Sequence, residues 1–134
     1  MPLYICSIPA DTLDARRRQQ IAAAITRIHC DVTGAPATFV HVVFRDSEPG
    51  QYLVFGRIRA GRSDDTKIAL KRQIAEAVAE AVGIELQKIT VFTKDIPASW
   101  VMEGGTLLPE PGEEGDWLAA HAPERLTPPH PTRS

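Results

Sequence analysis

A pattern that occurs twice along the chain constrains the fold more than any other feature. In each copy, a segment suited to a β-strand precedes a helical stretch with one apolar stripe, then a glycine and a second strand-like segment. A shift of 49 positions superimposes matching residues of the two copies: Ile25 on Ile74, Gly34 on Gly83, Val42 on Val91 and Asp46 on Asp95. The sequence therefore predicts two β-α-β units in tandem, at residues 2–46 and 52–96.

Local signals place the elements of each unit. The expected elements are strand 3–8, a helix from Asp11 or Thr12 to about Cys30, strand 38–44, strand 52–59, a helix capped by Ser63, and strand 88–93. Gly34 and Gly83 are expected to end the two helices in the left-handed conformation. Residues 46–50 are rich in turn-forming side chains and predict the turn between the units.

The order of these elements also predicts the architecture. A strand-helix-strand crossover makes its two strands parallel and puts the helix on one face of the sheet. Two such units side by side predict an α+β fold, with a four-stranded mixed sheet and both helices on the same face. Alternating apolar residues on the other face predict that an oligomer covers it.

The remainder of the chain is expected to form an arm and a tail. Residues 1–121 are interpreted as a single domain, in which residues 97–121 are the C-terminal arm. Within the arm, residues 98–103 predict one helical turn closed by two glycines, and residues 107–117 predict an ordered arm or hairpin. From Ala122 to the end at residue 134 the chain is polar and rich in proline, which predicts disorder.

Composition argues against several classes of function. The formal net charge is −2, so nothing in the overall field favours nucleic acid or an anionic membrane as a partner. The basic run Arg16–Arg18 is typical of a solvated helix face. No apolar run approaches transmembrane length and no signal-peptide pattern opens the chain, so we expect a cytoplasmic protein.

The two cysteines do not have the spacing of a metal or redox site. Cys6 and Cys30 both lie in apolar-periodic segments, and we expect both to be reduced and buried. His29 precedes Cys30 directly, but neighbours in a helix point about 100° apart, which is a poor geometry for shared metal ligation. We therefore expect neither a metal nor a cofactor.

Two local features can carry chemistry. The small residue Pro2 favours removal of the initiator Met1, which would leave a secondary amine that can be neutral near pH 7. Arg59 and Arg62 precede a predicted helix start, so they can form a carboxylate or phosphate site to which Gly61 allows close backbone approach. Each feature has an ordinary alternative, since chains commonly start with Met-Pro and arginines often lie in surface loops.

Taken together, the motifs resemble the tautomerase superfamily and, within it, the family of cis-3-chloroacrylic acid dehalogenase. The resemblance runs from Pro2 to about Trp117. The matching residues are Pro2, Ala24-Ile25-Thr26, His29, Thr33-Gly34, Arg59-Ala60-Gly61-Arg62-Ser63, Ile96-Pro97-Ala98, Glu103-Gly104 and Leu108-Pro109-Glu110-Pro111-Gly112. It implies a trimer of fused β-α-β units, in agreement with the uncovered sheet face.

The resemblance also implies roles for individual residues. Pro2 matches the catalytic N-terminal proline, and Arg59 and Arg62 match the pair that holds the substrate carboxylate. His29 matches a histidine that helps to bind that carboxylate. Glu103, a single acidic residue in a polar loop, matches the residue that activates water in the dehalogenase.

At one chemical position the sequence departs from the family. The residue that matches the family tyrosine of the fourth strand is Phe92, so a hydroxyl that assists Glu103 is missing. Neutral Pro2 fits keto-enol tautomerisation, whereas protonated Pro2 with water activated by Glu103 fits hydration or hydrolytic dehalogenation. Because only the second reaction needs the water, the sequence favours a tautomerase of small 2-oxo or unsaturated carboxylic acids with weak hydratase or dehalogenase side activity. A dehalogenase or hydratase of cis-3-haloacrylate-like acids and a non-catalytic module for small carboxylates remain the alternatives.

Overall fold

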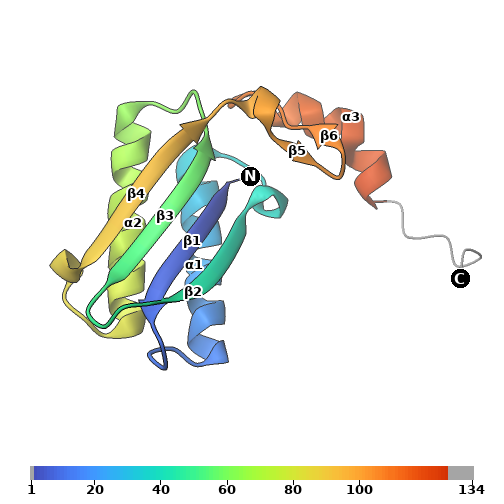
Figure 1. Ribbon diagram of the computed structural model, residues 1–134. Helices are drawn as coiled ribbons and strands as arrows, with labels where there is room; N and C mark the ends of the chain where they lie inside the picture. The colour runs from blue at the N-terminus through green and yellow to red at the C-terminus, as the bar shows by residue number, and fades with distance from the viewer. Residues whose placement is uncertain (1, 127–134) are drawn as a thin grey trace, which may run out of the picture.

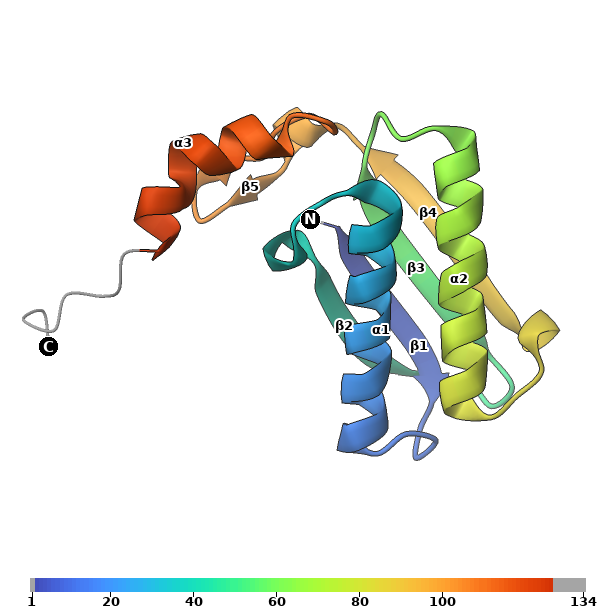
Figure 2. The same cartoon turned by 180° about the vertical axis from the view of Figure 1, so that it is seen from behind.

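A mixed sheet with two helices on one face forms the body of the protein, whose computed structural model describes residues 2–126, with side chains through residue 120. The sheet has the strand order β2-β1-β3-β4. The elements of the two units are β1 (Leu3–Pro9), α1 (Ala15–Thr33), β2 (His41–Ser47), β3 (Tyr52–Arg59), α2 (Asp64–Val82) and β4 (Ile89–Ile96). Figure 1 shows α1 and α2 behind the sheet, and Figure 2, seen from the opposite side, shows them side by side in front of it. The predicted α+β architecture is therefore confirmed.

The pairing of the strands joins the two units through their first strands. Within each unit the strands are parallel, with Leu3 opposite His41 and Tyr52 opposite Ile89. Between the units, β1 and β3 are antiparallel, with Leu3 opposite Arg57. Since β1 starts where β3 ends, the N-terminus of the chain lies at the same edge of the sheet as the loop that follows β3.

The ends of the helices follow the local signals with one exception. Gly34 and Gly83 end α1 and α2 in the left-handed conformation, with φ of 78° and 83°. Ser63 caps α2 by accepting a hydrogen bond from the backbone of Thr66 at 3.1 Å. The expected start of α1 was wrong, because Asp14 is the cap and Asp11 lies in the preceding turn with φ 65°.

The main core lies between the sheet and the two helices. It contains fully buried residues of β1, β3, α1 and α2: Tyr4, Cys6, Ile21, Ile25, Val54, Ile58, Leu70, Ile74 and Val78. Both cysteines are free thiols, as expected, but Cys30 is only partly buried. None of the helices within the described residues is long and apolar enough to cross a membrane.

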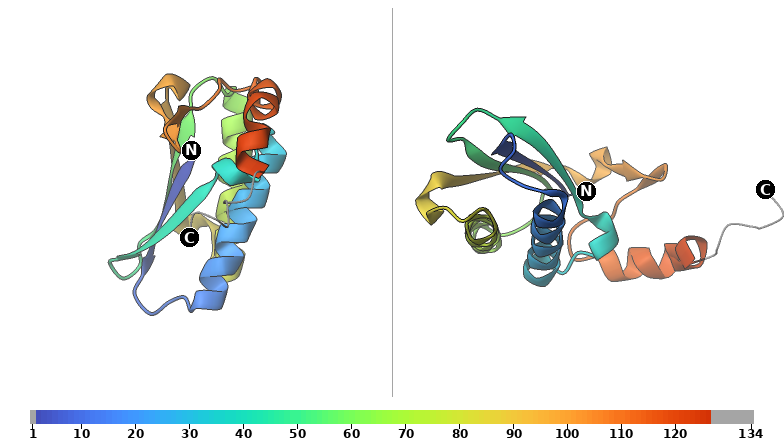
Figure 3. Two further views of the ribbon diagram at one scale, coloured as in Figure 1. Left: turned by 90° about the vertical axis from the view of Figure 1, so that its right-hand side faces the viewer. Right: turned by 90° about the horizontal axis from the view of Figure 1, so that it is seen from below.

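The face of the sheet that points away from the helices carries both large apolar and basic side chains. Val43, Phe55 and Phe92 are 50%, 36% and 51% exposed there. Exposed arginines alternate with them, Arg45 on β2 and Arg57 on β3. The side view of the sheet shows the two helices on one side and this open face on the other (Figure 3).

The arm departs from β4 and differs from the expected form. A short 3-10 turn (Ala98–Trp100) precedes the hairpin of β5 (Met102–Glu103) and β6 (Thr106–Leu107), and helix α3 (Glu114–Leu126) follows. The expected helical turn is therefore shorter than residues 98–103, and no helix was anticipated after the hairpin. We expected disorder from Ala122, but α3 continues through Leu126; residues 127–134 lie outside the described part of the chain.

A second, smaller core attaches the arm to the sheet. Phe39, Val101 and Leu108 are buried together, with Ile96 and Trp117 packed against them. The rings of Phe39 and Trp117 meet edge to face with centroids 5.4 Å apart. This contact fixes the first turns of α3 against the segment that leads into β2.

The contact between Gly56 and Tyr4 predicts a measurable effect on stability. A Cβ atom at Gly56 would lie 2.5 Å from Cε1 of Tyr4, whose ring is fully buried opposite it. Gly56→Ala must therefore displace the ring, and we expect it to lower the free energy of unfolding by about 1–3 kcal/mol. Gly115→Ala in α3 is the matched control, since its added Cβ meets no atom within 4 Å. Urea unfolding followed by circular dichroism measures both variants, and equal midpoints for the two would contradict the packing described here.

Candidate active site

Pro2 lies at the end of the sheet from which the arm departs. Its carbonyl oxygen accepts a hydrogen bond from the backbone N–H of His41 at 2.9 Å. Because Leu3 is opposite Arg57, the same register places Pro2 opposite Ile58 and next to Arg59. The Pro2 side chain is fully buried in this position.

Arg59 and Arg62 follow each other at the same edge. Arg59 ends β3 and is 2% exposed, and Arg62 lies in the loop before α2. Both guanidinium groups bind one acidic side chain of the arm: Nη2 of Arg59 and Nη2 of Arg62 donate to Oε2 of Glu114 at 2.7 Å and 2.9 Å. The backbone N–H of Gly112 donates to Oε1 of Glu114 at 2.7 Å.

The other guanidinium nitrogens are held by backbone carbonyls. Nη1 of Arg59 donates to the carbonyl of Pro109 at 2.6 Å, and Nη1 of Arg62 donates to that of Thr33 at 2.8 Å. The second bond supplies a partner at the C-terminal end of α1, where helix carbonyls lack one, and puts a cation at the negative end of the helix. The Arg59 guanidinium also lies 5.2 Å from the ring centroid of Phe39.

Burial and hydrogen bonding determine the charges of this cluster. Burial acts to raise the pKa of Glu114, but hydrogen bonds from Arg59, Gly112 and Arg62 outweigh it and hold the pKa below its ordinary value. Burial lowers the pKa of Arg59, which the hydrogen bond to Glu114 opposes. The cluster therefore consists of two cations and one anion.

His29 faces the same region from the last turns of α1. It is 2% exposed, and burial together with the charges of Arg62 and Arg59 lowers its pKa to about 3, so its ring is neutral. The Tyr4 hydroxyl lies 2.7 Å from Nδ1 of His29. Burial raises the pKa of Tyr4, so the phenol keeps its proton and the two neutral groups share one hydrogen bond. In the tautomer that accepts from Tyr4 at Nδ1, the ring proton of His29 is on Nε2 and can be donated to a ligand.

Glu103 lies on the hairpin of the arm, near the start of β2. One of its carboxylate oxygens is 3.8 Å from Nε2 of His41, the residue whose N–H binds Pro2. Burial lowers the pKa of Arg59, and the charge of Glu103 acts, with Glu114, against that lowering. The structure thus gathers five of the six sequence-predicted residues at one end of the sheet: Pro2, His29, Arg59, Arg62 and Glu103.

Phe92 does not join this group within one protomer. It is opposite Phe55 on β3, whereas Arg59 is opposite Ile96. Four residues along a strand correspond to about 13 Å. Phe92 points to the open face of the sheet, where it lines a hollow of about 460 Å³ with Ile5 and other strand residues.

The structure also corrects the expectation for Gly61. We expected its missing side chain to admit a ligand to the backbone. Instead, a Cβ atom at this position would lie 3.4 Å from Cγ of Pro111, so the arm occupies this space. The glycine is needed for its backbone conformation, since φ is 109°.

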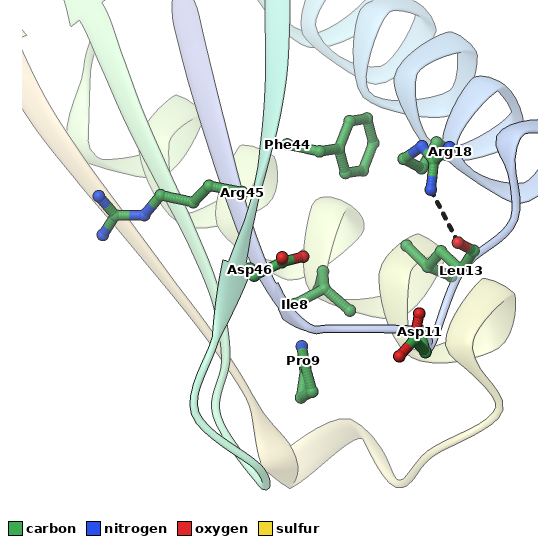
Figure 4. Close-up of a pocket in the computed structure, with 8 residues that line it drawn as sticks. All are labelled: Ile8, Pro9, Asp11, Leu13, Arg18, Phe44, Arg45 and Asp46. Carbon is green, nitrogen blue, oxygen red and sulfur yellow. Dashed lines mark hydrogen bonds between the residues drawn. The ribbon is translucent and has the colours of Figure 1, made fainter.

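The other end of the sheet holds a separate pocket that contains none of the predicted residues. Its volume is about 230 Å³, and it is lined by Ile8, Pro9, Asp11, Leu13, Arg18, Phe44, Arg45 and Asp46 (Figure 4). Within the described residues, no group of three or more His, Cys, Asp or Glu side chains could hold a metal ion. The gathered residues instead offer guanidinium donors, a neutral imidazole and a carboxylate, which suit proton transfer on a small acid.

Sequence reasoning missed two residues of this site. Glu114 was one acidic residue in a polar arm, and no local pattern relates it to arginines 52 and 55 residues away. Tyr4 was interpreted only as part of a buried strand. The alternation of β1 could have placed Tyr4 on the helix-facing side, but only the packing of α1 brings it to His29.

Comparison with known proteins identifies related sequences and folds. Residues 1–122 match the family Tautomerase_3, described as "Putative oxalocrotonate tautomerase enzyme". A solved member of the cis-3-chloroacrylic acid dehalogenase family aligns with a TM-score of 0.84 and 32% identity, over 88% of this chain and 91% of that one. A fused 4-OT, described as an asymmetric trimer, aligns with a TM-score of 0.73 and 25% identity, over 79% of this chain and 95% of that one. Malonate semialdehyde decarboxylase shares the fold, with a TM-score of 0.67 and 16% identity. The alignment covers 77% of this chain and 91% of that one. No curated protein matches the chain.

The buried, neutral His29 predicts that acid destabilises the fold. The pKa of His29 is about 3 in the folded chain and 6.5 ordinarily, so the unfolded chain binds one more proton between these values. Its contribution is complete above pH 6.5 and is lost as the pH falls toward 3, by about 1.4 kcal/mol for each pH unit. His29→Gln should therefore show a shallower decline of unfolding free energy with acidification than wild type. His41→Gln removes an exposed imidazole and is the matched control; equal slopes for wild type and His29→Gln would contradict the assignment.

Proposed function

Because this chain belongs to the tautomerase superfamily and, within it, to the family of cis-3-chloroacrylic acid dehalogenase, we propose that it is an N-terminal-proline enzyme acting on small 2-oxo or unsaturated carboxylic acids. The observation that carries the proposal is the meeting of Pro2, His29, Arg59, Arg62 and Glu103 at one end of the sheet. In this proposal the mature chain begins at Pro2, because an acylated proline nitrogen has no basic lone pair.

The reaction that the site supports best is keto-enol tautomerisation. A neutral Pro2 amine takes a proton from the enol form and returns it to carbon. Arg59 and Arg62 hold the substrate carboxylate and stabilise the charge that develops on the enolate. His29, neutral and protonated on Nε2, donates to the same carboxylate without adding a charge.

Hydration or hydrolytic dehalogenation is the second candidate, and the position of Glu103 favours it. Glu103 lies by the strand that binds Pro2, where it could activate water for attack on C3 while protonated Pro2 supplies a proton to C2. The missing hydroxyl of Phe92 weakens this candidate. Loss of one such catalytic hydrogen bond costs about 2–4 kcal/mol. We therefore assign this reaction the weaker, side activity.

Assembly into a homotrimer is part of the proposal. The open sheet face exposes Val43, Phe55 and Phe92, and burying such apolar surface favours association. Fused 4-OT has been solved as a trimer and shares the fold. Within one chain, Phe92 is too far from Arg59 to reach the site. In the proposed trimer, Phe92 of one protomer approaches the site of another.

Two rate measurements and one measurement of intact mass test the proposed reaction. The enol form of phenylpyruvate and cis-3-chloroacrylate are offered separately, and conversion is followed by ultraviolet absorbance and by chloride release. We expect enol conversion to be the faster reaction, and alkylation of Pro2 to abolish it. Intact mass should show the loss of Met1. An active preparation that retains Met1 would exclude Pro2 as the base, and ligand binding without any conversion would favour the non-catalytic module.

Sedimentation tests the proposed assembly. Wild type should sediment at three times the 14.7 kDa of one chain. Phe92→Glu places a charge on the open face and is expected to dissociate the trimer. Ile68→Glu is the matched control, because Ile68 is 57% exposed but lies on α2, on the other side of the sheet. A wild-type monomer at micromolar concentration would contradict the proposed assembly.

A further inference from the structure

Glu114 is the one charged member of the arginine cluster to which the proposed function gives no role. It is 8% exposed, and its Oε2 accepts from both Arg59 and Arg62. It comes from α3, outside the two β-α-β units. An ion pair on the surface would have little effect on binding. A carboxylate buried between two guanidinium groups, however, must affect any ligand that these groups bind.

The contacts of Glu114 hold it as a fixed part of the site. Its Oε1 accepts from the N–H of Gly112, and the packing of Trp117 on Phe39 anchors the same turn of α3. Arg59 and Arg62 each keep one Nη on a backbone carbonyl and one on Glu114. Both guanidinium planes are therefore oriented before any ligand binds.

Glu114 also changes the net charge that the site presents to a ligand. Two arginines alone would present two positive charges to a ligand in a site with little water. Glu114 cancels one of them, His29 is neutral, and Glu103 adds a further negative charge to the region. A ligand with one carboxylate then balances the one positive charge that remains on Arg59, Arg62 and Glu114 together. With the Pro2 amine neutral, a second carboxylate would find no further cation among the site residues described above and would be repelled by Glu103 and Glu114.

We propose that Glu114 is a positioning residue that orients Arg59 and Arg62 and, by cancelling one of their charges, selects acids with one carboxylate over acids with two. The proposal rests on the carboxylate-binding role assigned to the arginines above. It is tested at a pH at which the Pro2 amine is neutral, because a protonated amine would add a further cation to the site.

Binding of two matched acids tests this role without turnover. Isocrotonate and maleate share the cis-butene skeleton, and maleate has a carboxylate in place of the methyl group. At mildly alkaline pH, where both carboxyl groups of maleate are ionised, calorimetry measures the two dissociation constants. We expect wild type to bind isocrotonate about tenfold more tightly, and Glu114→Gln to reduce that preference by about fivefold or more.

The control and the outcomes separate the possible roles. Glu113→Gln removes the same charge from the exposed neighbour and should leave the preference unchanged. If Glu114 merely stabilised the fold, or if it were displaced by the ligand, Glu114→Gln would change both affinities together and leave their ratio intact, which overturns the proposal. If that variant does not fold, the wild-type measurement decides, since equal or tighter binding of maleate also overturns it. Failure of wild type to bind either acid would overturn the carboxylate site itself.

Discussion

The antiparallel pairing of β1 with β3 is the contact on which the arrangement of the site depends. It joins the two β-α-β units so that the start of one strand lies beside the end of the other. Pro2 therefore comes next to Arg59, although 57 positions separate them in the sequence numbering. A parallel pairing of the same two strands would have put the N-terminus beside the start of β3, at the opposite end of that strand from Arg59.

The arm supplies the acidic partner of the two arginines at the end of the sheet. Neither Arg59 nor Arg62 finds an acidic partner within the two units; both bind Glu114 of α3. Removal of one partner from a buried ion pair costs about 3–5 kcal/mol, because the remaining charge stays in a poorly solvated place. The arm thus has two physical tasks, to cover Phe39 with Trp117 and to compensate the charge of the arginines.

The interior behind Pro2 is polar but fully paired. Tyr4 and His29 satisfy each other, and the described residues contain no buried side-chain nitrogen or oxygen without a partner. His29 is also neutral, so an uncharged imidazole rather than a cation lies beside the arginines. Packing of α1 on β1 thus brings a neutral imidazole near the arginines.

Local sequence determined the elements, and tertiary packing determined which of them meet. The cap at Ser63, the left-handed glycines at positions 34 and 83, and the alternation of the strands all act within a few residues, so the two units could be predicted. The site roles of His29, Glu103 and Phe92, by contrast, were predicted only through the family resemblance. Helix α3 could not, since Gly115 and Pro123 weaken its local propensity and its first turns depend on contacts with Phe39, Arg59 and Arg62. The partner of the arginines, the space beside Gly61 and the distance of Phe92 from the site likewise depend on residues far apart in the chain, and only the folded structure brings those together.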